Sequence, residues 1–188
     1  MRKPSLAFLF FILSAASFIT ISSNRVNAVQ EDMQRASPSS EVSVDYALPY
    51  PGILPGHPLY PLKNFRDRLL DFLIKDPVKR VEYNLLMSDK RYAMGVYLTQ
   101  KQEYDRSLQI VQEGEEYYGK ITGEIRNAKD RERSLTADQF TTLQKAGEKH
   151  KNVLKEIQNE SPDDMVKGYN KIAEEIDTNI NTISGLRE

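Results

Sequence analysis

The 188-residue chain contains no cysteine, no tryptophan and only two histidines, His57 and His150. Without cysteine it has no disulfide, no thiolate nucleophile and no soft metal site, so packing alone must hold the fold together. The acyl anchor of a bacterial lipoprotein is excluded for the same reason. Neither histidine has a glutamate three residues before it, which excludes the paired Glu-x-x-His motifs of a di-iron bundle.

Motifs that carry catalytic chemistry are also missing. The sequence has no Gly-x-Ser-x-Gly elbow, no glycine-rich phosphate loop and no calcium loop with its glycine and closing glutamate. Two acidic runs, at residues 113–116 and 174–177, lack the spacing of a calcium site, and we expect them to be solvated helix faces. The sequence therefore predicts a protein that is not an enzyme and that uses no cofactor and no metal ion.

An excess of positive charge is absent from most of the chain. The first 28 residues contain three basic residues and no acidic one, so the remaining 160 carry 23 basic against 27 acidic residues. Binding to nucleic acid requires clustered, unbalanced positive charge. Because basic and acidic residues are interleaved here, nucleic acid is not expected as a partner.

Residues 1–28 have the pattern of a secretory signal peptide. Arg2 and Lys3 form a positive start, Leu6–Ile21 is apolar, and residues 26–28 offer the small side chains that signal peptidase prefers. The apolar stretch has 16 residues, fewer than the roughly 20 of a spanning helix, and an uncleaved membrane anchor is the alternative. Both interpretations place the rest of the chain outside the cytoplasm, as a periplasmic, secreted or cell-surface protein.

Two segments without helical periodicity follow. Residues 29–45 are polar and predict a flexible spacer, because they bury too little apolar surface to offset the entropy of ordering. Residues 46–61, which we call the strap, contain five prolines. Proline fixes φ and removes a hydrogen-bond donor, so the strap is neither a helix interior nor a central strand. Its apolar residues predict an extended segment packed along a helical domain that fills residues 46–188.

Helical periodicity begins at the end of the strap. Leu62, Phe65, Leu69 and Leu73 are spaced by three or four residues and predict a short helix from about residue 61 to 74. Asp76-Pro77 is typical of an N-cap with proline at the first helical position, and predicts a second helix that ends near residue 99.

The apolar stripe changes sides after residue 99. In a continuous helix the stripe from Tyr104 to Ile125 would lie roughly opposite the preceding one. We therefore expect a tight turn at residues 100–102 and a third helix over 103–130. No glycine or proline marks this turn, so one long helix over 77–130 is the alternative.

The last two helices have clearer start signals. Thr136 and Gln139 fit a capping box, and Ser161-Pro162 with two following acids fits the start of a helix that ends near Gly185. Short connections favour antiparallel neighbours. The sequence therefore predicts an all-α fold: an elongated bundle of about four long antiparallel helices plus one short N-terminal helix, preceded by the proline-rich strap.

One segment carries a family resemblance. Residues 54–63 read Leu-Pro-Gly-His-Pro-Leu-Tyr-Pro-Leu-Lys, and Arg66-Asp67, Asp76-Pro77 and Asp89-Lys90-Arg91 follow. With these residues the chain resembles an uncharacterised bacterial domain family found in exported or membrane-tethered proteins. The resemblance implies an extracytoplasmic helical domain of unknown function, and it brings no activity and no catalytic residues.

Candidate contact residues gather in and just after the strap. His57 is either a pH-sensitive or metal-contacting group, or a structural residue that bonds a carboxylate such as Asp67 and locks the strap onto the first helix. A second candidate set would form an ion-pair network between the first two helices, joining Arg66 and Asp67 to Asp89, Lys90 and Arg91. The candidate contacts to a ligand or partner are Tyr50, His57, Tyr60, Phe65, Arg66 and Asp67.

These features predict an exported, non-enzymatic interaction module that binds an unknown protein or cell-envelope component. A membrane would be contacted only by an N-terminal segment that remains uncleaved. The alternative is an extracytoplasmic small-ligand binder or sensor, with a pocket between the strap and the first two helices.

Overall fold

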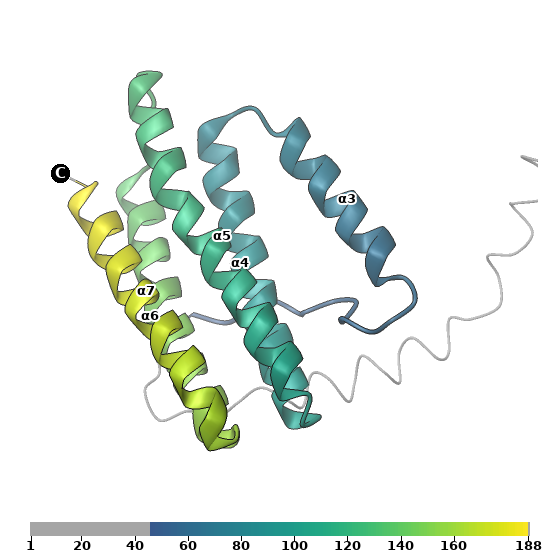
Figure 1. The fold of residues 1–188 in the computed structure, drawn as a ribbon. Helices are drawn as coiled ribbons and strands as arrows, with labels where there is room; N and C mark the ends of the chain where they lie inside the picture. The colour runs from purple at the N-terminus through teal and green to yellow at the C-terminus, as the bar shows by residue number, and fades with distance from the viewer. Residues whose placement is uncertain (1–45, 188) are drawn as a thin grey trace, which may run out of the picture. The chain divides into compact units, whose positions relative to one another are not determined.

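The computed structural model describes residues 46–187, which lie in one compact unit of the chain, residues 42–188. This part of the chain is all-α and contains no strand (Figure 1). The all-α prediction is therefore confirmed. The elements in chain order are α3 (Tyr60–Leu73), α4 (Pro77–Gln100), α5 (Tyr104–Asp130), α6 (Ala137–Glu160), the short 3-10 helix η2 (Asp163–Met165) and α7 (Val166–Gly185).

Local hydrogen bonds explain where α4 and α6 begin. The Asp76 carboxylate accepts a hydrogen bond of 3.1 Å from the backbone N–H of Lys79, and Pro77 occupies the first helical position, where no donor is needed. Thr136 and Gln139 form the predicted capping box, with reciprocal bonds of 2.9 and 3.2 Å. Both predicted start signals are confirmed.

The chain turns between α4 and α5 as the change of apolar face predicts, so the alternative of one long helix is wrong. Gln102 takes a φ of +60°, a conformation that usually requires glycine. The backbone N–H of Glu103 bonds Leu98 O at 2.9 Å, and that of Gln102 bonds Thr99 O at 2.8 Å. This is a Schellman motif with glutamine where glycine is usual, which is why no glycine marks the turn.

The start of the last helix differs from the expectation. The Ser161 hydroxyl donates back to Ile157 O at 2.7 Å, at the end of α6, instead of capping a new helix. Pro162 is extended, η2 follows, and α7 begins only at Val166. The proline and acids do mark a boundary, but the first turn after it is 3-10 rather than α.

Helices α4 to α7 enclose the core (Figure 1). Gly114 allows α4 and α5 to approach closely, because a Cβ there would lie 2.9 Å from Arg91 Cβ. One apolar cluster is built around Tyr92, Met94, Leu98, Ile110, Val111, Val153, Leu154, Ile157, Tyr169, Ile172 and Ile176. The other is built around Val81, Tyr118, Ile121, Ile125, Ala128, Leu135, Phe140, Leu143, Ala146 and Ile183.

Helix α3 stands apart from these four. Figure 1 shows it at the edge of the bundle, joined to α4 by a short connection, and it contributes no residue to either apolar cluster. Among residues 46–187, no helix combines the length and the apolar character needed to cross a bilayer.

Candidate functional site

Helix α3 turns its apolar face outward. Its large apolar side chains are exposed: Leu62 and Phe65 at 65% each and Phe72 at 77%. Leu69 and Leu73 of the same face are also exposed. The periodicity predicted the helix correctly, but the stripe that defines it does not face the bundle.

The buried residues of α3 are a lysine and an aspartate. Lys63 and Asp67 are only 7% and 4% exposed, and Lys63 Nζ donates to Asp67 Oδ2 at 2.9 Å. Arg66 also donates to this carboxylate, at 2.7 Å. Burial alone would raise the pKa of the Asp67 carboxyl, but the bonds from Lys63 and Arg66 outweigh burial and hold this pKa below its usual value. The polar side of α3 can therefore be covered by the bundle without an unpaired carboxylate.

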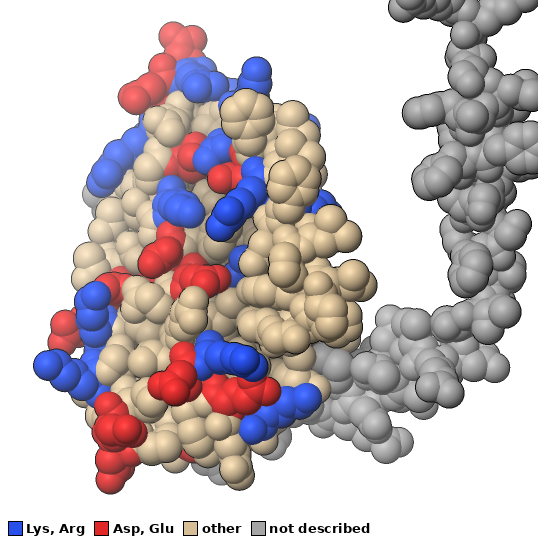
Figure 2. Space-filling model, turned by 45° about the vertical axis from the view of Figure 1, so that its right-hand side comes forward, with Lys and Arg blue, Asp and Glu red and all other residues tan. Residues whose placement is uncertain are grey.

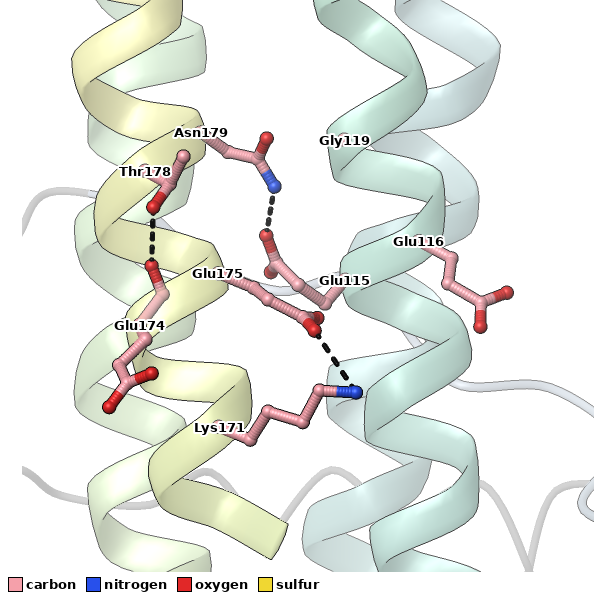
Figure 3. A pocket seen from close by; sticks show the side chains of 8 residues that line it. All are labelled: Glu115, Glu116, Gly119, Lys171, Glu174, Glu175, Thr178 and Asn179. Atoms are coloured by element: carbon pink, nitrogen blue, oxygen red, sulfur yellow. Dashed lines mark hydrogen bonds and ion pairs between the residues drawn. The ribbon is translucent and has the colours of Figure 1, made fainter.

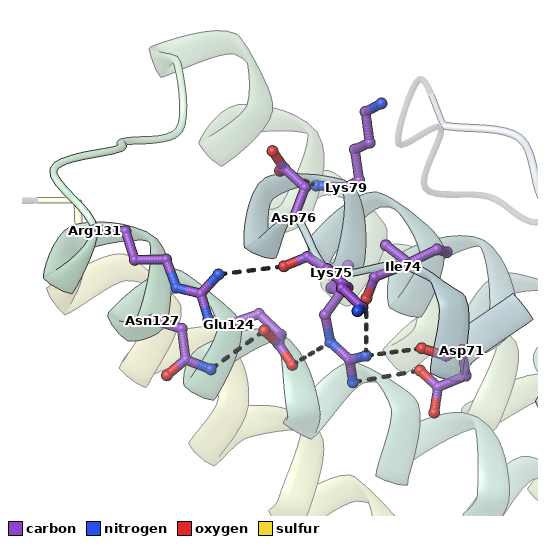
Figure 4. Close-up of polar contacts among 9 residues, drawn as sticks. Asp71, Ile74, Lys75, Asp76, Lys79, Glu124, Asn127 and Arg131 are labelled. Carbon is purple, nitrogen blue, oxygen red and sulfur yellow. Dashed lines mark hydrogen bonds and ion pairs between the residues drawn. The ribbon is translucent and has the colours of Figure 1, made fainter.

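Polar bonds from α4 fasten this inner side. The Tyr83 hydroxyl donates to Asp67 O at 2.7 Å. Arg80 donates to Asp71 O at 2.9 Å and to Ile74 O at 3.3 Å, and pairs with the Asp71 carboxylate at 3.3 Å. Its Nε also donates to Glu124 of α5 at 2.7 Å, so one guanidinium joins the end of α3 to two helices of the bundle (the junction is drawn in Figure 4).

A second layer of contacts closes the same junction. Arg131, just after α5, donates to Lys75 O at 3.3 Å, and Asn127 donates to Glu124 at 3.3 Å (Figure 4). Arg133 forms an ion pair with Asp76. The outward orientation of the apolar face is thus fixed by bonds at the C-terminal end of α3 as well as along its inner side.

The six candidate contact residues do not converge on one pocket. Phe65 is 65% exposed and Asp67 is 4% exposed, because they lie on opposite faces of α3. His57 is exposed and does not bond Asp67; its Nδ1 accepts a hydrogen bond of 3.1 Å from the backbone N–H of Leu59. Tyr60 is half-buried, and Tyr50 is 49% exposed. The expected lock between His57 and Asp67 is wrong because Lys63 and Arg66 of the same helix occupy that carboxylate.

The expected ion-pair network between α3 and α4 does not form, because its charged residues pair with other partners. Arg66 pairs with Asp67 within α3, whereas Arg91 pairs with Glu113 of α5 at 3.5 Å and lies over the Tyr117 ring. Asp89 is directed to the core, and Lys90 beside it is partly exposed. Three consecutive residues of a helix point about 100° apart, so they cannot all face one neighbour.

A polar cluster lies inside the bundle. His150 of α6 is fully buried, in step with the core residues Phe140, Leu143 and Leu154, and its Nε2 lies 2.7 Å from Asp89 Oδ1. The Tyr46 hydroxyl donates to the other Asp89 oxygen at 2.6 Å, and the Tyr92 ring stacks on the imidazole at 4.1 Å. An Asp–His pair suits acid–base chemistry when a substrate can reach it, but this pair is sealed. Through the Asp89 carboxylate, this cluster connects Tyr46, the first residue of the strap, to α4 and α6.

Glu115 is another buried polar residue, and its burial was not predicted. It was expected on a solvated face, yet it is 1% exposed, with bonds from Asn179 at 2.6 Å and from the Tyr92 hydroxyl at 2.9 Å. Burial raises the pKa of the Glu115 carboxyl, and those two hydrogen bonds oppose the shift only in part. Its position four residues after Val111 and three before Tyr118, both in the core, is the signal that could have found it.

A shallow pocket of about 460 Å³ lies between α5 and α7. Three contacts within it are drawn in Figure 3: Lys171 pairs with Glu175 at 3.6 Å, Thr178 donates to Glu174 O at 2.8 Å, and Asn179 donates to Glu115 at 2.6 Å. Within residues 46–187, no group of three acidic or histidine side chains is arranged to hold a metal ion. The pocket lining is Glu115, Glu116, Gly119, Lys171, Glu174, Glu175, Thr178 and Asn179.

The fold and these sites define a class of protein: a helical bundle domain with an edge helix whose apolar face is uncovered. The chain belongs to the DUF5667 family, a domain of unknown function, whose sequence profile matches residues 52–164. The match begins in the strap and ends in η2, so α7 lies beyond it. No curated protein and no solved structure matches the chain.

Proposed function

We propose that this protein is exported and acts as a non-enzymatic interaction module, binding a component of the cell envelope through the apolar face of α3. The observation that carries the proposal is the orientation of that helix, because leucines and phenylalanines face solvent while a lysine and an aspartate are buried. Contiguous apolar surfaces of this kind on soluble domains mark interaction sites. The signal-peptide pattern of residues 1–28 supports the location.

Exposure of this face is not the result of loose packing. The bonds from Tyr83 and Arg80 fix the inner side of α3, so rolling the apolar stripe into the bundle would break them. A small-ligand pocket lined by Tyr50, His57, Tyr60 and Phe65 has less support, since Phe65 points away from the bundle.

Site-specific photo-crosslinking tests the proposal. A photoreactive amino acid placed at Phe65, in the chain expressed in its native host, is expected to form an adduct with an envelope component. The same probe at Glu116, an exposed residue of α5, is the matched control and should give no such adduct. The adduct at position 65 should disappear when Leu62 and Phe72 are replaced by serine. Equal labelling from both positions, or none from position 65, would contradict the proposal.

A further inference from the structure

We infer that the component covering the apolar face of α3 is the surface of an anionic phospholipid bilayer. This inference rests on the proposed function and names the partner. It follows from three properties of α3: the composition of its outward face, the charges beside that face, and the way its inner side is attached.

The outward face has the composition of an interfacial membrane helix. Leu62, Phe65, Leu69, Phe72 and Leu73 lie within about 100° of one another around the helix axis, and all five are exposed. Helices that lie in the membrane plane place such side chains about 5–10 Å into the boundary between headgroups and acyl chains. With 14 residues, α3 is too short to span a bilayer, so it can only lie on the surface.

The charges beside this face are positive. Arg66 and Arg68 are exposed and fall on the two flanks of the apolar stripe, and Lys75 follows the end of the helix. The two acids of α3 are neutralised, since Asp67 is bonded to Lys63 and Arg66, and Asp71 to Arg80. Figure 2 shows a face with few charged atoms on the side that carries α3, and both basic and acidic side chains at its border. Cations around an apolar face complement anionic headgroups.

A second copy of this chain is a poorer partner for the apolar face of α3 than a lipid surface. In an antiparallel pair of α3 helices that cross at their centres, Arg66 and Arg68 of one copy would lie beside the same residues of the other, because both are near the middle of Tyr60–Leu73. Like charges at a contact are destabilising. Asp67 is already paired with Arg66 and Asp71 with Arg80, so neither carboxylate of α3 is left to pair with Arg68 of the other copy.

The attachment of α3 suits insertion at a surface. Its polar side, which a free amphipathic helix would leave in water, is held by α4 through Tyr83 and Arg80. The helix is therefore already folded before it meets the membrane. Binding does not have to offset the conformational entropy of forming it.

Vesicle binding tests the inference. The probes are vesicles of phosphatidylcholine alone and vesicles that also contain phosphatidylglycerol. They are mixed with the chain from Val29 onward, which lacks the predicted signal peptide and contains every residue of both core clusters. Co-sedimentation is expected with the anionic vesicles and should weaken as salt is added. The Phe65→Ser/Phe72→Ser variant should bind about tenfold or more weakly. Both side chains are exposed, so the circular dichroism spectrum should not change.

Two matched variants separate the apolar and charge contributions. Leu86→Ser removes a leucine of α4 that is 42% exposed and should leave vesicle binding unchanged. Arg68→Glu/Lys75→Glu should abolish the preference for anionic vesicles, whereas Arg126→Glu on α5 should have little effect. The inference is overturned if the folded chain does not bind anionic vesicles, or if Phe65→Ser/Phe72→Ser binds them as tightly as the unchanged chain.

Other outcomes distinguish this inference from the proposed function. An adduct between position 65 and an envelope protein, without vesicle binding, would overturn the lipid inference and leave the interaction module standing. A dimer in analytical ultracentrifugation that Phe65→Ser/Phe72→Ser dissociates would overturn it in favour of a second copy. Failure of both the crosslinking and the vesicle assays would remove both proposals.

Discussion

Glu115 is a buried carboxylate whose ionisation affects the free energy of unfolding. It accepts hydrogen bonds from Tyr92 and Asn179, so it joins α4, α5 and α7 through one side chain. Its burial raises the pKa of the carboxyl above the usual value. A carboxyl with a higher pKa in the folded than in the unfolded state binds its proton more tightly when folded, so its ionisation costs stability. That cost is absent below the unfolded pKa of about 4.3 and complete above the folded pKa.

A Glu115→Gln variant cannot ionise at this position, so it should avoid the loss of stability that the unchanged chain suffers as the pH rises. The difference in melting temperature, variant minus unchanged chain, should be greatest near pH 8 and should fall as the pH is lowered towards 4. Any loss of hydrogen bonding in the variant adds only a constant offset. Thermal melts followed by circular dichroism across this range measure the difference. Glu116→Gln, the exposed neighbour, should show no such trend, and a difference that grows at low pH would mean that the pKa of Glu115 is lowered.

Among single residues, the spacing of His150 is enough to place it in the core, but the burial of Glu115 and the hydrogen-bond partner of His57 could not be predicted. His150 is in step with Phe140, Leu143 and Leu154, and its polarity is compensated by Asp89. Glu115 has the same kind of position, but its place in a run of acids concealed it. The partner of a buried polar group comes from another helix, and a single sequence does not show which residues of two helices meet.

Helix α3 is held to the bundle by few bonds, and Arg80 supplies several of them. Replacing Arg80 by alanine removes its bonds to Asp71, Ile74 and Glu124. This should destabilise the attachment of α3 by about 1–3 kcal/mol, since hydrogen bonds to charged groups are worth this much. Amide hydrogen exchange should then become faster in α3, with little change in α5 to α7. Arg126→Ala, at an exposed position of α5, is the control, and unchanged exchange in α3 would show that Arg80 does not hold it.

The sequence predicted each helix but not the orientation of α3. A 3.6-residue period shows which side chains share a face, and says nothing about which way that face points. The capping signals of α4 and α6 are local, so they could be read directly from residues 76–77 and 136–139. The inward side of α3 depends on Lys63 and Asp67 neutralising each other and on Tyr83 being present on α4, which is a tertiary relation.

At the scale of the whole molecule, the core includes α7, although the family profile matches the chain only up to residue 164. Helix α7 places Tyr169, Ile172, Ile176 and Ile183 in the core, each fully buried. Both apolar clusters contain residues of α7, so neither closes without it. Residues 52–164 alone would therefore leave α4, α5 and α6 with an uncovered apolar groove.

Truncation tests this dependence. A chain from Val29 that ends at Glu160 should lose cooperative thermal unfolding, because four large buried side chains contribute about 2–5 kcal/mol each and a domain of this size has only about 5–15 kcal/mol of stability. A chain that ends at Leu186 keeps all four and should melt as the unchanged one does. Circular dichroism at 222 nm measures both. A sharp transition in the shorter chain would mean that α4, α5 and α6 form a core by themselves and that α7 is an addition to it. Loss of the transition would mean instead that the folding unit extends past the matched residues to the end of α7.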